Sequence, residues 1–151
     1  MAFYLEKAIF INRAPFEHLE LDFKEKGIFV LTAVNGKGKT TILSYIVDAF
    51  YELAKMYYSQ EFEGKEDKYY RVSSSIYNLD SNSPSFVYFR FKNNGLNIDY
   101  IDVRNKCQQT EYERLITLDD KMRFEKFHNR LDRSNNVKFW NINSNETKKI
   151  V

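Results

Sequence analysis

The chain has 151 residues and a formal net charge of +2 at pH 7, from 23 basic and 21 acidic side chains. This length is sufficient for one domain with its own core, and the balanced charge gives no overall basic footprint for nucleic acid. The single cysteine, Cys107, excludes a disulfide within the chain, and no cysteine–histidine spacing fits a zinc site. The sequence has no signal-peptide pattern and no apolar run of membrane-spanning length, so we expect a cytoplasmic protein without a membrane partner.

Three strands are predicted in the first part of the chain. Residues 4–11 are largely apolar, and residues 17–23 alternate, with Leu19 and Leu21 on one face and acidic side chains on the other. This alternation is typical of an antiparallel strand with one solvent-exposed face. Residues 28–32 are apolar almost throughout, which indicates a central strand covered on both faces.

The segment that follows carries the clearest functional signal. Residues 33–41 read Ala-Val-Asn-Gly-Lys-Gly-Lys-Thr-Thr and lead into an amphipathic helix predicted over 40–58. A strand, a glycine-containing loop and a helix with Lys-Thr at its start have the layout of a phosphate-binding P-loop. Backbone N–H groups at such a helix start face the phosphates, Lys39 is expected to reach the β- and γ-phosphates, and the Thr40 hydroxyl suits Mg²⁺. The sequence therefore predicts a site for ATP and Mg²⁺.

The P-loop residues predicted to contact the nucleotide are Ala33, Asn35, Gly36, Lys37, Gly38, Lys39, Thr40 and Thr41. Thr40 is also the predicted metal ligand. Ala33 stands where the usual motif begins with glycine, and two interpretations stay open. Either this position has an ordinary φ and the methyl group is harmless, or the phosphate cradle is altered, because alanine tolerates positive φ and close backbone approach poorly.

A β-hairpin is predicted downstream. Residues 86–92 and 96–103 alternate between apolar and polar side chains, and they are joined by Asn94-Gly95, the preferred pair for a type I′ turn.

The last predicted elements are a helical region over 106–133 and a short strand over 137–142. The helical region has an apolar stripe formed by Met122, Phe124, Phe127 and Leu131. We favour a surface helix packed on the sheet; the alternative is a helix that contacts DNA.

Two motifs resemble those of a known family. The form Asn-Gly-x-Gly-Lys-Thr-Thr from Asn35 resembles the Walker A motif of ABC-type ATPases of the SMC/RecF/OLD group. Residues 4–23, with an Asn-Arg corner before Phe16, resemble the opening of such heads, and the resemblance covers roughly residues 4–58.

This resemblance implies an α/β P-loop NTPase fold: an ABC-type N-terminal lobe with a mixed sheet and an added antiparallel hairpin near the nucleotide. Residues 1–151 would then be the N-terminal part of one head domain. The Asn-Arg corner lies near the nucleotide in such heads, which implies that Arg13 contacts the base or a phosphate. The alternative is that Arg13 is a solvated charge at a surface corner.

The second half of the family pattern is absent from the sequence. No Ser-Gly-Gly signature occurs, and the nearest Walker B mimic, Leu115 to Asp120, has a threonine inside it and Asp120 where the catalytic glutamate would stand. We favour a short strand or helix end with a solvated Asp pair at this position, and we predict no catalytic residue in the chain. ATP hydrolysis is expected only with the missing Walker B and signature regions.

The resemblance therefore predicts the ATP-binding lobe of an ATPase in DNA maintenance, including DNA repair, or in phage defence of the Septu or OLD kind. Its expected partners are a second head or a nuclease, and DNA in the full-length protein. Two alternatives stay open. One is a complete small P-loop kinase with Leu115 to Asp120 as its Walker B motif; the other is an interaction module that binds ATP without catalysis.

Overall fold

The computed structural model describes residues 3–23, 37–58, 77–105 and 121–142. In chain order its elements are β1 (Phe3–Arg13), β2 (Phe16–Asp22), α1 (Lys37–Tyr57), β3 (Ser85–Asn93), β4 (Leu96–Arg104), α3 (Lys121–Arg133) and β5 (Val137–Asn141). Neither of the two described helices is long and apolar enough to cross a membrane.

The described strands form one sheet in the order β2-β1-β3-β4-β5, and every neighbouring pair is antiparallel. The chain is therefore a mixed α/β protein, but the mixed sheet predicted above is not found among the described strands. The predicted strand at 28–32 lies outside them.

The predicted hairpin of β3 and β4 is confirmed, and its strands are central in the described sheet. It occupies the middle of the sheet, because β3 pairs with β1 on one side and with β4 on the other. The physical reason is that both of its faces are apolar: Phe86 and Tyr88 are buried on one face, and Val87 and Phe89 on the other. A strand of this kind is stable only where both faces are covered.

Most of the predicted local elements are confirmed. The strands predicted over 4–11 and 17–23 are β1 and β2, and that over 137–142 is β5. Asn94 and Gly95 both have positive φ, 51° and 84°, as a type I′ turn requires.

The two helices differ from the predictions mainly at their ends. α1 begins at Lys37, earlier than the predicted start at residue 40. α3 forms the part of the predicted region 106–133 that the structure describes, and Phe127 and Leu131 are buried against the sheet. The predicted packing of this helix on the sheet is thus confirmed, and the DNA-contact alternative is a separate question that packing does not test. The side chains of Met122 and Phe124 lie outside the described residues.

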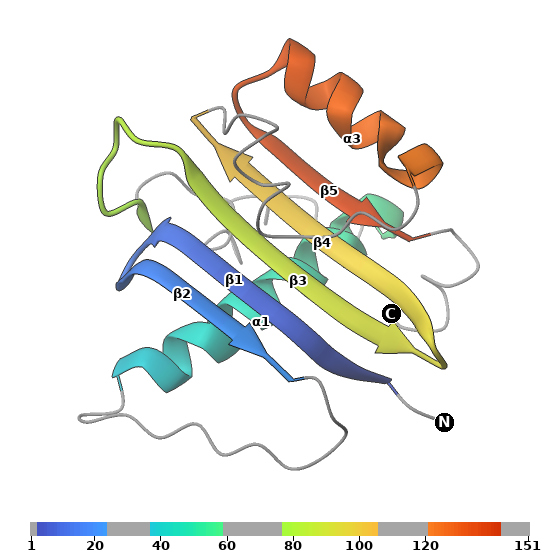
Figure 1. The fold of residues 1–151 in the computed structure, drawn as a ribbon, viewed down its shortest axis with the longest axis horizontal. Coiled ribbons are helices and arrows are strands. Elements are labelled where there is room, and N and C mark those ends of the chain that lie inside the picture. Colours follow the sequence, from blue (N-terminus) through green and yellow to red (C-terminus); the bar gives the residue numbers. More distant parts are fainter. Residues whose placement is uncertain (1–2, 24–36, 59–76, 106–120, 143–151) are drawn as a thin grey trace.

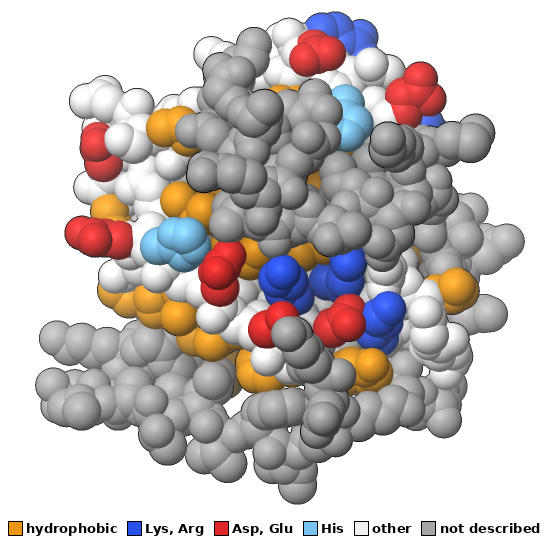
Figure 2. Space-filling view, in the orientation of Figure 1, with side chains coloured by type: hydrophobic (Ala, Val, Ile, Leu, Met, Phe, Trp, Pro, Cys, Tyr) orange, Lys and Arg blue, Asp and Glu red, His pale blue; other side chains and the backbone are white. Residues whose placement is uncertain are grey.

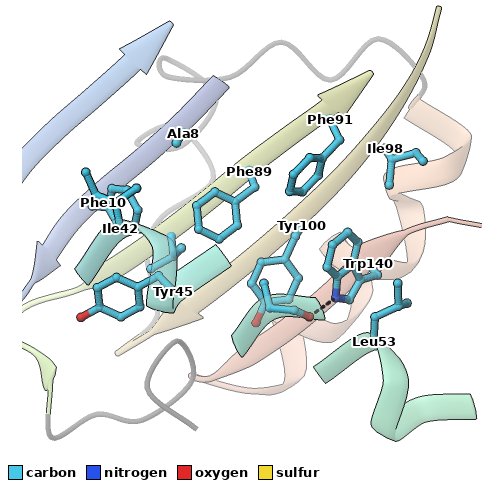
Figure 3. Packing of buried hydrophobic residues seen from close by; sticks show 12 residues of the cluster. Ala8, Phe10, Ile42, Tyr45, Leu53, Phe89, Phe91, Ile98, Tyr100 and Trp140 are labelled. Atoms are coloured by element: carbon cyan, nitrogen blue, oxygen red, sulfur yellow. Dashed lines mark hydrogen bonds between the residues drawn. The ribbon is translucent and has the colours of Figure 1, made fainter. Parts of the chain in front are cut away.

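The sheet is covered by α1 on one face and by α3 on the other (Figure 1). The core under α1 is rich in aromatic rings, and Tyr100 lies 4.9 Å from Trp140 between ring centroids. Figure 3 shows these rings beside Phe89 and Phe91, with the Trp140 indole N–H donating to a backbone carbonyl. That carbonyl belongs to Ala49, at 3.1 Å, so the helix is held to the sheet by a directional bond as well as by ring packing.

Candidate nucleotide-binding site

The start of α1 is the candidate site, because the P-loop sequence leads directly into it. Lys37, Gly38 and Lys39 lie in the first turn, Thr40 is exposed, and Thr41 is partly buried. The first turn of α1 contains no acidic residue, and the first N–H groups of any helix carry a partial positive charge because they have no acceptor within the helix. This end of α1 is therefore electrostatically suited to an anion.

Some predicted contacts cannot be located. Ala33, Asn35 and Gly36 lie outside the described residues, as does the Walker B mimic at 115–120. The helical backbone at 37–39 is described, but its side chains are not.

A hydrogen bond fixes the N-terminal half of α1 against the corner between β1 and β2. The Tyr45 hydroxyl donates to the Ala14 carbonyl at 2.8 Å, and the Tyr45 side chain is fully buried. Its ring also packs on Phe10 of β1, with centroids 5.4 Å apart. The corner residues and the P-loop helix are thereby held in one rigid unit.

Arg13 lies at this corner and is fully buried, so the solvated-charge alternative is wrong. Its guanidinium carbon lies 5.6 Å from the centre of the Tyr45 ring, and its Nη1 donates to Asn78 Oδ1 at 2.7 Å. Burial lowers the pKa of Arg13, and the nearby Tyr45 and Asp102 partly oppose that effect. Arg13 thus brings a desolvated cation close to the P-loop helix.

The corner is also bonded to the segment before β3. The Asn12 side chain donates to the carbonyls of Asp80 and Ser83, at 2.8 and 3.1 Å, and accepts from the Asp80 N–H at 2.7 Å. Asn12 has a positive φ of 53°, which asparagine tolerates better than most residues. Ala14 N–H adds a bond to the Tyr77 carbonyl at 2.7 Å.

A buried carboxylate lies on the same face of the sheet as Arg13. Asp102 accepts from Arg104 Nε at 3.0 Å and from the Tyr100 hydroxyl at 3.3 Å. Burial raises the pKa of Asp102, and the Arg104, Arg13 and Lys138 charges oppose that shift. The cation at the corner therefore faces a buried acid, which helps to keep Arg13 in the interior.

The sequence identified Asn12 only as part of the Asn-Arg corner, and it did not single out Tyr45 or Asn78. Tyr45 has the helical spacing of the predicted apolar face, three residues after Ile42. That periodicity marks it as buried but does not reveal the partner of its hydroxyl. Asn78 gave no signal, because its contact with Arg13 spans 65 residues of sequence.

The described residues at the start of α1 are compatible with a nucleotide and its metal. A helix N-terminus whose first turn has no carboxylate suits phosphates, and an exposed Thr40 suits a hydroxyl ligand for Mg²⁺. No group of three or more His, Cys, Asp or Glu side chains gathers among the described residues. Any Mg²⁺ here would depend mainly on phosphate oxygens and water, which is the usual arrangement for this ion.

The family model of the AAA domain matches residues 10–150. The chain belongs to this AAA domain family, which supports an ATP-binding, ATPase-type function. No curated protein and no solved structure matches the chain.

Proposed function

We propose that this chain is the ATP-binding lobe of an SMC/RecF/OLD-like ATPase that acts in DNA maintenance or phage defence. The observation that carries the proposal is the Asn-Gly-Lys-Gly-Lys-Thr-Thr sequence at the start of a helix whose N-terminal half is bonded to the Asn-Arg corner. The match to the AAA domain family supports the nucleotide part of the proposal.

Each residue has a distinct role in this proposal. The backbone around Gly36 and Gly38 cradles the phosphates, and Lys39 supplies their counter-charge. Thr40 supplies a hydroxyl to Mg²⁺, which neutralises charge on the phosphate oxygens when bound. Arg13 adds a second cation at the corner.

We propose that hydrolysis requires a Walker B carboxylate and a signature motif supplied elsewhere. The buried carboxylates of the described sheet do not serve this purpose in the proposal, because each already accepts from cations or phenols. Asp99 accepts from Tyr88 and from Arg90, and Asp102 from Arg104 and Tyr100. The partner would be a second head of the same kind, or a nuclease that responds to the ATP-bound state of this lobe.

Calorimetric titration of ATP with and without Mg²⁺ tests the proposal. Lys39→Ala should abolish or sharply weaken binding, whereas Lys126→Ala, which removes an exposed lysine of α3, should leave it unchanged. Thr40→Ala should weaken chiefly the part of the ATP affinity that depends on Mg²⁺. Unaltered affinity in Lys39→Ala would show that the P-loop is not the site.

A turnover assay separates this proposal from the small-kinase alternative. The chain alone should release phosphate no faster than background, because no catalytic carboxylate is predicted at the phosphates. Robust phosphate release that is lost in Asp119→Asn or Asp120→Asn would favour a complete small enzyme instead.

A further inference from the structure

α3 carries a net positive charge, and the rest of the chain does not. Its residues Lys121–Arg133 include five basic and two acidic side chains, a net charge of +3 against +2 for the whole chain. The rest of the chain is therefore slightly acidic. On the face of the molecule that Figure 2 shows, acidic and basic side chains lie close together over the sheet. The strands also contain paired charges, such as Arg90–Asp99 and Lys92–Glu6.

The C-terminal end of α3 opens onto a shallow pocket beside the start of β5. The pocket has a volume of about 380 Å³, and its described lining residues are Arg130, Arg133, Ser134, Asn136, Val137 and Lys138. Three of these side chains are cationic and none is acidic. The pocket lies at the edge of the described sheet, since β5 is the last strand of its order.

The two arginines of this pocket are held by neutral groups. Arg130 Nη1 donates to the Lys138 carbonyl at 3.4 Å, and Arg133 Nε donates to the Asn129 carbonyl at 3.1 Å. The Arg130 guanidinium carbon also lies 5.9 Å from the centre of the Phe139 ring. Among the described residues neither arginine has a carboxylate partner, so both guanidinium groups are oriented without being neutralised.

Lys138 differs from the two arginines. Its ammonium group pairs with Glu52 of α1 at 2.8 Å, and Glu52 also pairs with Lys55 at 3.2 Å. The charge of Lys138 at the pocket is therefore reduced by a carboxylate that belongs to the helix carrying the P-loop.

We propose that this pocket binds backbone phosphates of a nucleic-acid strand. A guanidinium group matches a phosphate in two-point geometry, and two such groups line this pocket together with Ser134 and Asn136. The pocket is shallow and open, whereas sites for small molecules enclose most of the ligand surface. A strand that passes across the pocket fits this shape.

The competing explanation is that Arg130 and Arg133 only stabilise α3. Basic residues in the last turn of a helix favourably oppose its negative end, and the Arg133 bond to Asn129 is of this kind. The test must therefore separate phosphate binding from helix stability.

The experiment is a fluorescence-anisotropy titration of a short labelled single-stranded DNA with the full chain, without ATP. Arg130→Gln and Arg133→Gln should each weaken binding several-fold and lower the salt dependence of log K by about one unit. Lys126→Gln removes the same charge from an exposed position of α3 outside the pocket and should change the affinity by less than about two-fold. Glu52→Gln should strengthen binding, because the Lys138 ammonium group then loses its carboxylate partner and its charge acts fully on the phosphates.

Thermal melts of every variant accompany the titration and show whether each variant is folded. If Arg130→Gln does not fold, Arg130→Lys replaces it, because it keeps the positive charge and loses only the guanidinium geometry. The proposal is overturned if the chain does not bind the oligonucleotide, or if Lys126→Gln weakens binding as much as the pocket variants do. Lys39→Ala should retain oligonucleotide binding, so a failure here is distinguishable from a failure of the ATP proposal.

Discussion

The Tyr45 hydroxyl donates a hydrogen bond to the Ala14 carbonyl, 2.8 Å away, and so connects the P-loop helix to the corner between the first two strands. The same ring lies beside the Arg13 guanidinium. One aromatic side chain therefore positions both the helix whose start is the candidate phosphate site and the second cation proposed for it.

Tyr45→Phe should lower the free energy of unfolding by about 0.5–1.5 kcal/mol, because the Ala14 carbonyl loses its donor while the ring and its packing remain. Urea denaturation measures this. Tyr58→Phe, which alters an exposed tyrosine after the end of α1, is the matched control and should change stability by less than about 0.5 kcal/mol. Equal stability of Tyr45→Phe and the wild type would show that the hydrogen bond contributes nothing.

Arg13→Lys keeps the charge but loses the planar group that lies on Tyr45 and bonds to Asn78. We expect a loss of about 1–3 kcal/mol in stability, because the Asn78 oxygen loses its donor at a partly buried contact. If Arg13 also contacts the nucleotide, ATP affinity measured by calorimetry on the folded variant should fall. Unchanged affinity together with reduced stability would assign Arg13 to the architecture of the corner alone.

Asp80 should make the segment before β3 sensitive to acid. The Ser83 hydroxyl, at 2.6 Å, and the Asn82 N–H, at 2.9 Å, lower the pKa of Asp80 below its ordinary value of 3.8. The ionised form is thus favoured more in the folded than in the unfolded chain. Its contribution to stability is fully present above pH 3.8 and is lost as the pH falls through the lower, folded value.

Melting temperatures of the wild type and Asp80→Asn, compared from neutral pH to below pH 3.8, check this expectation. The difference between them should be largest at neutral pH and should shrink with acid. Asp132→Asn, at an exposed position of α3, serves as the control. A difference that grows on acidification would contradict the assigned direction of the shift.

Ala33→Gly tests whether the departure from the usual P-loop pattern matters. If Ala33 has an ordinary φ, glycine only makes the unfolded chain more flexible, and stability should fall by roughly 0.4–1 kcal/mol with ATP affinity unchanged. We expect this result, because Gly36 and Gly38 are retained where the backbone approaches the phosphates. A higher melting temperature together with tighter ATP binding would instead reveal strain at Ala33.

The sequence by itself determined the local elements and the position of the candidate site. Alternation over residues 17–23, the Asn94-Gly95 turn and the apolar face of α1 are short-range patterns, and each is set by backbone geometry and side-chain period. The P-loop was also recognisable, because its chemistry requires glycines, a lysine and a threonine at fixed spacing next to a helix start.

Only the tertiary structure decided which strands pair and which polar groups are buried. The hairpin lies in the middle of the sheet because β3 pairs with β1, a contact between residues far apart in sequence. The burial of Arg13 depends on Tyr45 and Asn78, which come from a helix and a later segment. A charged side chain in the interior requires partners brought together by the whole fold, and sequence periodicity carries no information about such partners.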